Sequence, residues 1–568
     1  MKRILVSSVS YPWRCGKRTL VTLPRITKIF DERVLDNTLH PPYDIHVPKI
    51  TYTDMVWEGM ETKGHLPAMT CGLSGRTLSH GELQEEALRL SKTLQGLNHV
   101  KTIGILLPNC VEYPAIICGS LHAGVTVTTL NPAYTPSEIA HQLEAARVDI
   151  LFAANSLQEK VLSTVSLYSK LSMVVFVDAE SQLNTGALKL DEKSVPYSQF
   201  LSVSPARSGA RIDTVKDTAI MPFSSGTTGP PKGVELSQHN LVVQCLTMAV
   251  DGESFYRAFG KLQDVTVAVL PMYHIFGLAV TMTGALWAGS RQVTLPRFDS
   301  DLYIRCLEKY SPTYLHMVPP IVGFLASSPK VSAEHLSSLR QVNCGAAPCG
   351  LTLIEKFALK APRVLFREGW GMTETTGAAT AFHRSYQESA PGSVNTLLPN
   401  LRMRIVDSDT DEILGVDQTG ELQVKGEGIT KGYFNNEEAT RKTFSQDGWM
   451  KTGDVGYFNK DGIIYISDRI KELIKVNGLQ VAPAELENTL RQLDGVEDVA
   501  VVGVQDGRAG QLPRAFIVRS GSLTEADVKQ WMSLKLSAHK QLNGGVVFVD
   551  SIPKSAAGKI LRKDLVGK

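Results

Sequence analysis

The segment 224–233 (SSGTTGPPKG) carries the residues best suited to hold a phosphate group. It contains three glycines, four hydroxyl side chains and one lysine in ten residues. Glycines let the backbone approach an oxyanion, hydroxyl and N–H groups donate to it, and a lysine adds a positive charge. We therefore predict a phosphate-binding loop rather than a flexible linker. Its expected ligands are Ser224, Ser225, Gly226, Thr227, Thr228, Gly229 and Lys232.

This loop is not a Walker A loop, because a glycine follows its lysine where a Walker A loop has Ser or Thr. Four more motifs follow it along the chain. They read GAAP at 345–348, GWGMTE at 369–374, KTGD at 451–454 and PKSAAGK at 553–559. Together with the loop they resemble, in order, the motifs of the adenylate-forming superfamily, which includes acyl-CoA synthetases, coumarate–CoA ligases and beetle luciferases. The resemblance extends from Val47 to Leu565. It implies an enzyme that joins a small carboxylic acid first to AMP and then to CoA. ATP and CoA would be its co-substrates and Mg²⁺ its cofactor.

The resemblance also implies the nucleotide contacts. Trp370 would stack near the adenine, Thr373 would hydrogen-bond the α-phosphate, and Glu374 would hold Mg²⁺, a hard cation that prefers oxygen ligands. Asp454 would accept from both ribose hydroxyls. Glu368 stands where relatives often carry Gln. Besides the loop, the implied ATP or AMP contacts are Gly345, Ala346, Ala347, Pro348, Glu368, Gly369, Trp370, Gly371, Thr373, Asp454, Arg469, Lys475 and Gln480.

Lys559 matches the catalytic lysine of the family. In the first step the carboxylate attacks the α-phosphorus of ATP and pyrophosphate leaves. An ammonium placed between these anions stabilises the charge of the transition state, an effect worth roughly 3–4 kcal/mol. His274 matches a residue beside the acyl pocket and the CoA channel, so it joins Thr373 and Glu374 in the expected catalytic set. We assign it no general-base role, because an acyl-adenylate is already activated and CoA reacts as a thiolate.

Two steps in one site imply a mobile domain. Lys471 matches the hinge about which the small domain of the family rotates between the steps. Rotation would replace Lys559 with the loop 475–482. Gly478 would then line the CoA tunnel beside Asn477, which replaces a lysine common in coumarate–CoA ligases.

The acyl pocket implied by the family contains His274, Asn343 and Gly377. Asn343 replaces a lysine that, in plant members, reaches toward the ring hydroxyl of the acid. Loss of this cation and the small neutral residues nearby favour a medium- or long-chain fatty acid. An aryl or hydroxycinnamate-type acid is the alternative, as is a luciferase-like oxygenase that makes the same adenylate. The identity of the acid and the oligomeric state stay open.

The elements that position these residues follow an α/β pattern. Apolar residues at helical spacing predict a helix over 79–97, and the runs 102–107 and 125–130 flank a second helix over 111–123. This is a βαβ unit and predicts a parallel sheet covered by helices. Further buried strands are expected at 150–153, 173–177, 218–223, 265–270, 314–317, 341–344 and 502–504.

We expect three parts along the chain: a basic extension (1–30), a large AMP-binding domain (31–468) and a small lid domain (469–568). The large domain would hold parallel sheets flanked by helices, and the resemblance adds a small barrel-like subdomain. The small domain would be a mobile α+β unit with its hinge near Lys471. A hairpin is expected at 459–462, just before this boundary.

Composition excludes several other classes. Lys plus Arg is 59 and Asp plus Glu is 57, and a net charge of +2 gives no electrostatic footprint for nucleic acid. The 8 cysteines form no C-x-x-C pair, which argues against a structural zinc site. No uncharged apolar run of about 18 residues is present, so no membrane span is expected.

The first 30 residues are basic, carry no acid and are rich in Ser and Thr. This is the composition of a mitochondrial transit peptide and predicts a matrix enzyme. A disordered basic tail is the alternative, with a cytoplasmic or peroxisomal location. The chain ends in LVGK rather than in a peroxisomal S-K-L signal.

Overall fold

A seven-stranded sheet is built around the expected βαβ unit. In this computed structural model, β7 (Thr102–Leu106), α4 (Tyr113–His122) and β8 (Thr126–Thr129) confirm that unit, and every residue of β7 is buried. All strands are parallel except β15, which pairs antiparallel with β12. The spatial order is β11 (Ser194–Pro196), β10 (Met173–Val177), β9 (Ile150–Ala154), β7, β8, β12 (Thr218–Ile220) and β15 (Leu236–Ser237).

The structure describes residues 25–30, 32–179, 192–224, 231–249, 258–259, 262–381, 390, 392–477, 479–555 and 558–566. Six residues of the expected phosphate loop, Ser225 to Pro230, and Gly478 of the expected CoA tunnel lie outside these ranges. So does most of the basic extension, although Ile26–Ile29 forms β1, which pairs with β4 (Tyr43–Ile45). Within the described ranges, no helix is long and apolar enough to cross a membrane, and the cysteines are free and buried.

Helices cover both faces of this sheet. Helix α3 (His80–Gly96) begins at a capping box in which Ser79 accepts from the backbone N–H of Glu82, and its leucine stripe is buried. With α3 and α4, one face is covered by α1 (Tyr52–Val56), α8 (Gln238–Ala249) and α9 (Thr283–Ala288). The other face is covered by α5 (Pro136–Ala146) and α6 (Gln158–Leu167).

Two further sheets complete the α/β part of the large domain. In the first, β18, β19 and β5 are parallel and β6 is antiparallel; the second has three parallel strands. Their strands are β18 (Val265–Ala268), β19 (Arg291–Thr294), β5 (Pro67–Cys71) and β6 (Thr77–Ser79), then β20 (Tyr314–Met317), β21 (Gln341–Cys344) and β22 (Leu365–Glu368). The connecting helices are α10 (Ser300–Tyr310), α11 (Pro319–Ser327) and α12 (Leu351–Lys360).

The expected barrel-like subdomain is an antiparallel sheet. Among the described residues, its pairing runs from β2 to β29 without closing into a ring. The strands are β2 (Val34–Leu35), β3 (Thr38–Leu39), β25 (Leu401–Val406), β27 (Gly420–Gly426), β28 (Met450–Phe458) and β29 (Ile464–Arg469), with β26 (Ile413–Leu414) beside β25. The predicted hairpin joins β28 to β29, where Asn459 accepts from the N–H of Asp461 and of Ile463.

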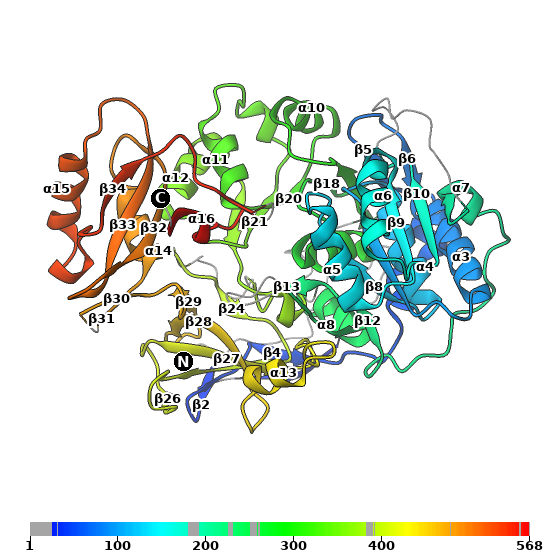
Figure 1. Ribbon diagram of the computed structural model, residues 1–568, viewed down its shortest axis with the longest axis horizontal. Coiled ribbons are helices and arrows are strands. Elements are labelled where there is room, and N and C mark those ends of the chain that lie inside the picture. The colour runs from blue at the N-terminus through cyan, green and yellow to red at the C-terminus, as the bar shows by residue number, and fades with distance from the viewer. Residues whose placement is uncertain are drawn as a thin grey trace.

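The C-terminal residues form an α+β unit with its own core. The run 502–504 lies in β32 (Val496–Asp506), so its expected strand is present, but it pairs antiparallel with β33 (Gly510–Arg519). The other strands are β30 (Ile474–Val476), β31 (Leu479–Val481) and β34 (Gly545–Phe548). Helices α14 (Pro483–Leu490), α15 (Glu525–Lys535) and α16 (Lys563–Val566) pack with them. In Figure 1 this unit, orange to red, lies opposite the cyan and blue seven-stranded sheet, with the yellow antiparallel sheet below.

Candidate active site

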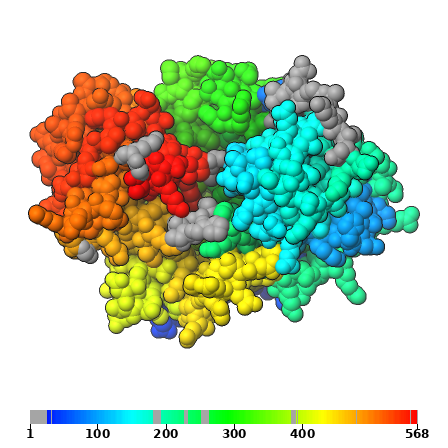
Figure 2. All heavy atoms as spheres, in the orientation of Figure 1, coloured from blue at the N-terminus to red at the C-terminus, as the bar shows by residue number. Residues whose placement is uncertain are grey.

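A cavity of about 1110 Å³ lies where the large domain meets the C-terminal unit. Figure 2 shows the red C-terminal residues beside the green and cyan parts of the large domain, around this region. The carboxyl ends of β20, β21 and β22 open into it, as expected for parallel strands in α/β folds. The predicted residues that line it are Ser224, Lys232, His274, Asn343, Gly345, Ala346, Glu368, Gly369, Trp370, Gly371, Thr373, Glu374, Gly377, Arg469, Lys471 and Lys559.

Both ends of the phosphate loop reach the cavity. The predicted strand 218–223 is split into β12 and β13 (Phe223–Ser224), because Pro222 offers no N–H for a ladder bond. Strand β13 pairs antiparallel with β14 (Lys232–Gly233), so that Ser224 stands directly opposite Lys232. The hydroxyl of Ser224 and the ammonium of Lys232 therefore flank the base of the loop, on the side of the cavity.

The GAAP turn follows β21 and is tied to β22. Glu368 accepts from the backbone N–H of Cys349 at 2.8 Å, and the N–H of Gly369 donates to the carbonyl of Cys344 at 3.0 Å. Burial raises the pKa of Glu368. Gly345 and Ala346 line the cavity, whereas Ala347 and Pro348 do not belong to its lining. Glu368 thus holds the expected adenine turn in place from the neighbouring strand.

The expected ribose carboxylate, Asp454, lies just behind the cavity lining. It is 3% exposed and stands opposite Arg469 across β28 and β29. Its two oxygens accept from Trp370 Nε1 at 2.8 Å and from Arg469 Nε at 3.0 Å. These two donors orient the carboxylate, while the ring of Trp370 and the guanidinium of Arg469 face the cavity.

Glu374 presents one buried carboxylate to the cavity. It lies in the short helix η4 (Thr373–Thr375) and is 4% exposed, and its Oε1 accepts from Ser224 Oγ at 2.9 Å and from Tyr433 OH at 3.0 Å. No group of three or more His, Cys, Asp and Glu among the described residues could hold a metal alone. This donor set fits Mg²⁺, which commonly binds through one or two carboxylates and takes phosphates and waters as its other ligands.

Lys559 enters the cavity from the C-terminal unit. Lys554 and Ile560 form an antiparallel bridge, and the N–H of Ser555 donates to the carbonyl of Lys559 at 2.7 Å. Gly558 has φ +79°, and a Cβ there would come within 3.2 Å of Val318 at the start of α11, so glycine lets the backbone beside Lys559 approach the large domain. Burial and the neighbouring Arg469 lower the pKa of Lys559.

His274 is a neutral donor at the cavity. Burial, with a smaller effect of Lys559, lowers its pKa to about 4, so the ring is uncharged at neutral pH. Its Nδ1 accepts from the backbone N–H of Phe276 at 3.3 Å, which places the ring proton on Nε2. His274 therefore borders the cavity as an uncharged ring.

A polar wall lines the inner part of the cavity. Strands β20 and β21 run parallel, with Tyr314 paired to Gln341 and His316 paired to Asn343. Asn343 Nδ2 and Gln341 Nε2 donate to the hydroxyl of Tyr314 at 2.6 and 3.1 Å, and Gln341 Nε2 also donates to Asn343 Oδ1 at 3.0 Å. The sequence motifs identified Asn343 but missed its neighbours. Alternation of polar and apolar residues in these strands was the available signal.

The structure does not bring every predicted residue to the cavity. Lys475, Asn477 and Gln480 lie on the β30–β31 hairpin, where Lys475 and Gln480 are exposed and none of the three belongs to the lining. Lys559 occupies the site in their place. Lining residues that the motifs did not indicate include Tyr433 and Arg367. No local pattern marks Tyr433, whose partner Glu374 is 59 residues away.

Comparison with known proteins gives consistent matches. The family model described as AMP-binding enzyme matches residues 56–434, and the AMP-binding enzyme C-terminal domain matches 485–559. The 4-coumarate–CoA ligase 3 of Oryza sativa subsp. japonica is 36% identical over 523 residues, covering 91% of this chain and 92% of that protein. The rice 4-coumarate–CoA ligase 5 is 37% identical over 534 residues, covering 92% and 96%. The crystal structure of ATP-bound MatB from Rhodopseudomonas palustris aligns with a TM-score of 0.79 at 27% identity, covering 91% and 99%.

Proposed function

The chain belongs to the AMP-binding enzyme family and is an ATP-dependent acid–CoA ligase, and from this premise we propose that its acid is a hydroxylated arylpropenoic acid of the 4-coumarate type. The polar wall of Gln341, Asn343 and His316, backed by the buried hydroxyl of Tyr314, is the observation that carries the proposal. Relatives named 4-coumarate–CoA ligases, matched over nearly the whole chain, support it. The fatty acid favoured by the sequence has no support from these relatives.

Energetics favour a hydroxyl-bearing acid over an alkyl chain at this wall. A buried polar group left without a hydrogen bond costs about 1–3 kcal/mol. An alkyl chain laid against Asn343 and His316 would displace water without replacing its hydrogen bonds. A ring hydroxyl can both donate and accept, so it can take the second N–H of Asn343 Nδ2, whose first N–H donates to Tyr314. Asn343, which replaces the lysine of the plant members, can therefore bind a phenol hydroxyl through its neutral amide.

The first step uses the residues that converge on the cavity. The enzyme uses ATP, Mg²⁺ and CoA, and Mg²⁺ supplies positive charge that neutralises phosphate oxygens. Lys232 and the phosphate loop hold the phosphates, and Lys559 offsets the repulsion between the carboxylate and the α-phosphate. The carboxylate oxygen bonds to the α-phosphorus, the bond to pyrophosphate breaks, and an acyl-adenylate results. The CoA thiolate then attacks the acyl carbon, and AMP leaves.

For the second step we propose rotation of the C-terminal unit about Lys471. The exposed hairpin that carries Lys475 and Gln480, and the position of Lys559 in the cavity lining, support this division between two steps. A hydrogen bond joins the two sides of the proposed hinge, because Asp468 accepts from the backbone N–H of Ala484, the second residue of α14, at 2.8 Å. Rotation would break this bond and withdraw Lys559.

The test of the substrate is a comparison of kcat/KM for three acids in the full ligase reaction. With 4-coumarate, cinnamate and dodecanoate, we expect 4-coumarate to exceed cinnamate, which lacks only the ring hydroxyl, by at least about tenfold. Dodecanoate should be poorer still. A dodecanoate value above that of 4-coumarate would refute the proposed substrate class while leaving the ligase activity intact.

From the sequence alone we also propose that residues 1–30 direct the enzyme to the mitochondrial matrix. The basic, acid-free, hydroxyl-rich composition supports this. A fusion of this segment to a fluorescent protein should colocalise with a matrix marker, and a variant with its Lys and Arg residues changed to Gln should not. A diffuse signal from the unaltered fusion would argue for the cytoplasmic alternative.

A further inference from the structure

Residues 427–434 form a segment that crosses from the antiparallel sheet to the phosphate loop, and we call it the strap. Its backbone pairs with the chain that leaves the loop. The N–H of Glu235 donates to the carbonyl of Gly432 at 3.0 Å, and that of Phe434 donates to the carbonyl of Gly233 at 2.8 Å. Val234 and Tyr433 form an antiparallel bridge between them. The strap therefore extends the β13–β14 hairpin that carries Ser224 and Lys232.

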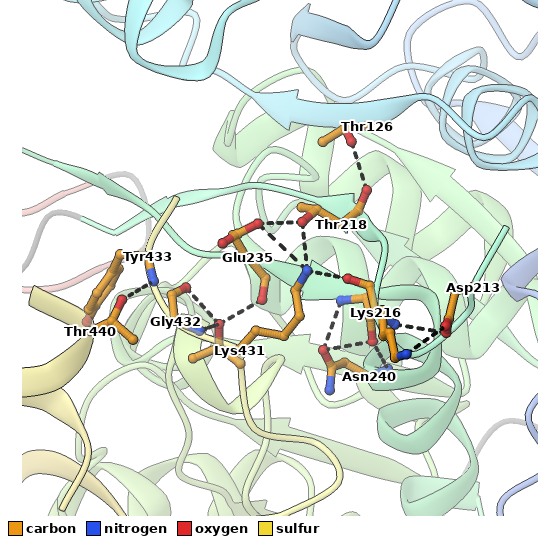
Figure 3. A network of polar contacts seen from close by, with 12 residues as sticks. Thr126, Asp213, Lys216, Thr218, Glu235, Asn240, Lys431, Gly432, Tyr433 and Thr440 are labelled. Atoms are coloured by element: carbon orange, nitrogen blue, oxygen red, sulfur yellow. Dashed lines mark hydrogen bonds and ion pairs between the residues drawn. The ribbon is translucent and has the colours of Figure 1, made fainter. Parts of the chain in front are cut away.

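Side chains anchor the strap to the edge of the seven-stranded sheet, as Figure 3 shows. Lys431 Nζ donates to the carbonyl of Lys216 at 2.6 Å and to Thr218 Oγ1 at 2.9 Å. Thr218 in turn donates to Glu235 Oε1 at 2.5 Å, and Lys431 Nζ lies 3.7 Å from the same oxygen. Thr430 Oγ1 donates to the backbone carbonyl of Glu235 at 2.7 Å. These bonds fix the strap over β12 and β15.

The next residues fix the backbone of Tyr433. Gly432 has φ +136°, and a Cβ there would come within 2.5 Å of Thr440, so this position requires glycine. Thr440 Oγ1 then accepts from the backbone N–H of Tyr433 at 2.9 Å. The tyrosine is thus held from both sides, by Val234 across the bridge and by Thr440 of α13 (Glu437–Thr443).

This backbone places the side chain of Tyr433 between two charged residues of the site. Its hydroxyl donates to Glu374 Oε1 at 3.0 Å, and Lys232 Nζ lies 5.4 Å from the centre of its ring. A phenol is protonated at neutral pH and a carboxylate only accepts, so the hydroxyl is the donor in this bond. The strap also holds the backbone of the helix η4, because the N–H of Thr430 donates to the carbonyl of Glu374 at 2.8 Å.

We infer that Tyr433 is a positioning residue that orients the Glu374 carboxylate for Mg²⁺–ATP, and that Lys431 anchors the strap that carries it. Tyr433 and Ser224 both bind Oε1, which leaves Oε2 to point toward the metal. A hydroxyl bond that fixes one oxygen limits rotation of the carboxylate, and this reduces the entropy lost on metal binding. The ring of Tyr433 restricts Lys232 through a cation–π contact.

The test is calorimetric titration of the full-length enzyme with ATP, with and without Mg²⁺. Tyr433→Phe removes the hydroxyl and keeps the ring. It should weaken ATP binding in the presence of Mg²⁺ by about three- to tenfold, as expected for the loss of one hydrogen bond, and by less than about twofold without Mg²⁺. Thioester formation from supplied acyl-adenylate and CoA, which needs no ATP, should stay unchanged. Lys431→Met should produce a smaller change of the same kind.

Two comparisons make the result decisive. Tyr457→Phe removes a tyrosine hydroxyl from β28, where the ring stacks on Tyr465 away from the cavity, and should bind ATP as the unaltered enzyme does. In a Glu374→Gln background, Tyr433→Phe should have little further effect, because it acts through that carboxylate. Unchanged affinity in Tyr433→Phe, or an equal loss with and without Mg²⁺, would overturn the inference.

Discussion

Arg469 donates from Nε to Oδ1 of Asp454 at 3.0 Å, so the carboxylate expected at the ribose is held by a cation that also faces the cavity. Asp454 is 3% exposed. Without the guanidinium its buried carboxylate would keep the hydrogen bond from the indole of Trp370 but would have no neutralising cation beside it. Arg469→Ala should therefore weaken ATP binding and lower the free energy of unfolding by about 1–3 kcal/mol. Calorimetry and thermal unfolding measure the two effects.

The matched control for this prediction is Arg404→Ala on the same antiparallel sheet. Arg404 pairs with Asp447, whose side chain is 56% exposed, and such a pair contributes about 0–1 kcal/mol. ATP affinity should not change in this control. If the two substitutions changed ATP affinity and the free energy of unfolding equally, the Arg469–Asp454 pair would stabilise the sheet without contributing to nucleotide binding.

Asp468, at the proposed hinge, should make the free energy of unfolding depend on pH. Burial raises its pKa from 3.8 to about 6. Because the folded pKa exceeds the unfolded one, the stability from this group is full below about pH 4 and is lost as the pH rises through about 6. Asp468→Asn can still accept from Ala484 and carries no charge. Its Tm should match that of the unaltered enzyme near about pH 4 and exceed it above about pH 6.5. A Tm difference that is constant with pH would contradict this account.

Lys559 should serve the first step alone. Lys559→Ala is expected to slow acid-dependent pyrophosphate release by about 10²–10³-fold. Thioester formation from supplied acyl-adenylate and CoA should proceed at the normal rate. Lys554→Ala is the control, since Lys554 belongs to the same sequence motif but pairs with Asp498 at 2.6 Å outside the cavity. Equal loss in both steps of Lys559→Ala would disprove the division of labour.

Asn343 should determine the preference for a ring hydroxyl. In Asn343→Leu, kcat/KM for 4-coumarate should fall by about tenfold, because the bond from the amide to the substrate is lost. Cinnamate, which lacks the hydroxyl, should be used as well as before or better. The ratio of the two acids is the measurement, and it cancels any general loss of activity. An unchanged ratio would remove Asn343 from the specificity site.

Sequence patterns predicted the central strands well, because these strands are buried on both faces. The strands at 173–177, 314–317 and 341–344 have the predicted bounds, and the helix over 79–97 differs by only one residue at each end. The end of the strand at 218–223 was wrong, because Pro222 interrupts the ladder there. Motif order identified sixteen of the residues that line the cavity, from Ser224 to Lys559.

Contacts that join distant segments could not be predicted in this way. The polar wall needs the register between β20 and β21, which sets Asn343 beside His316. Tyr433 reaches Glu374 only because the strap pairs with residues 233–235, and neither segment carries a local signal for that pairing. The position of Lys475 and Gln480 depends on how the C-terminal unit is oriented. The sequence contains the motifs for both steps of the reaction, so it does not show which of them lies at the cavity in one orientation.

The most direct test of an acyl-adenylate pathway follows the oxygen of the acid. The unaltered full-length enzyme would be supplied with 4-coumarate labelled with ¹⁸O in its carboxylate, with ATP, Mg²⁺ and CoA. Attack of the carboxylate on the α-phosphorus predicts that AMP gains one labelled oxygen and that pyrophosphate gains none, as measured by mass spectrometry. Unlabelled AMP, or label in inorganic phosphate beside ADP, would contradict the mechanism.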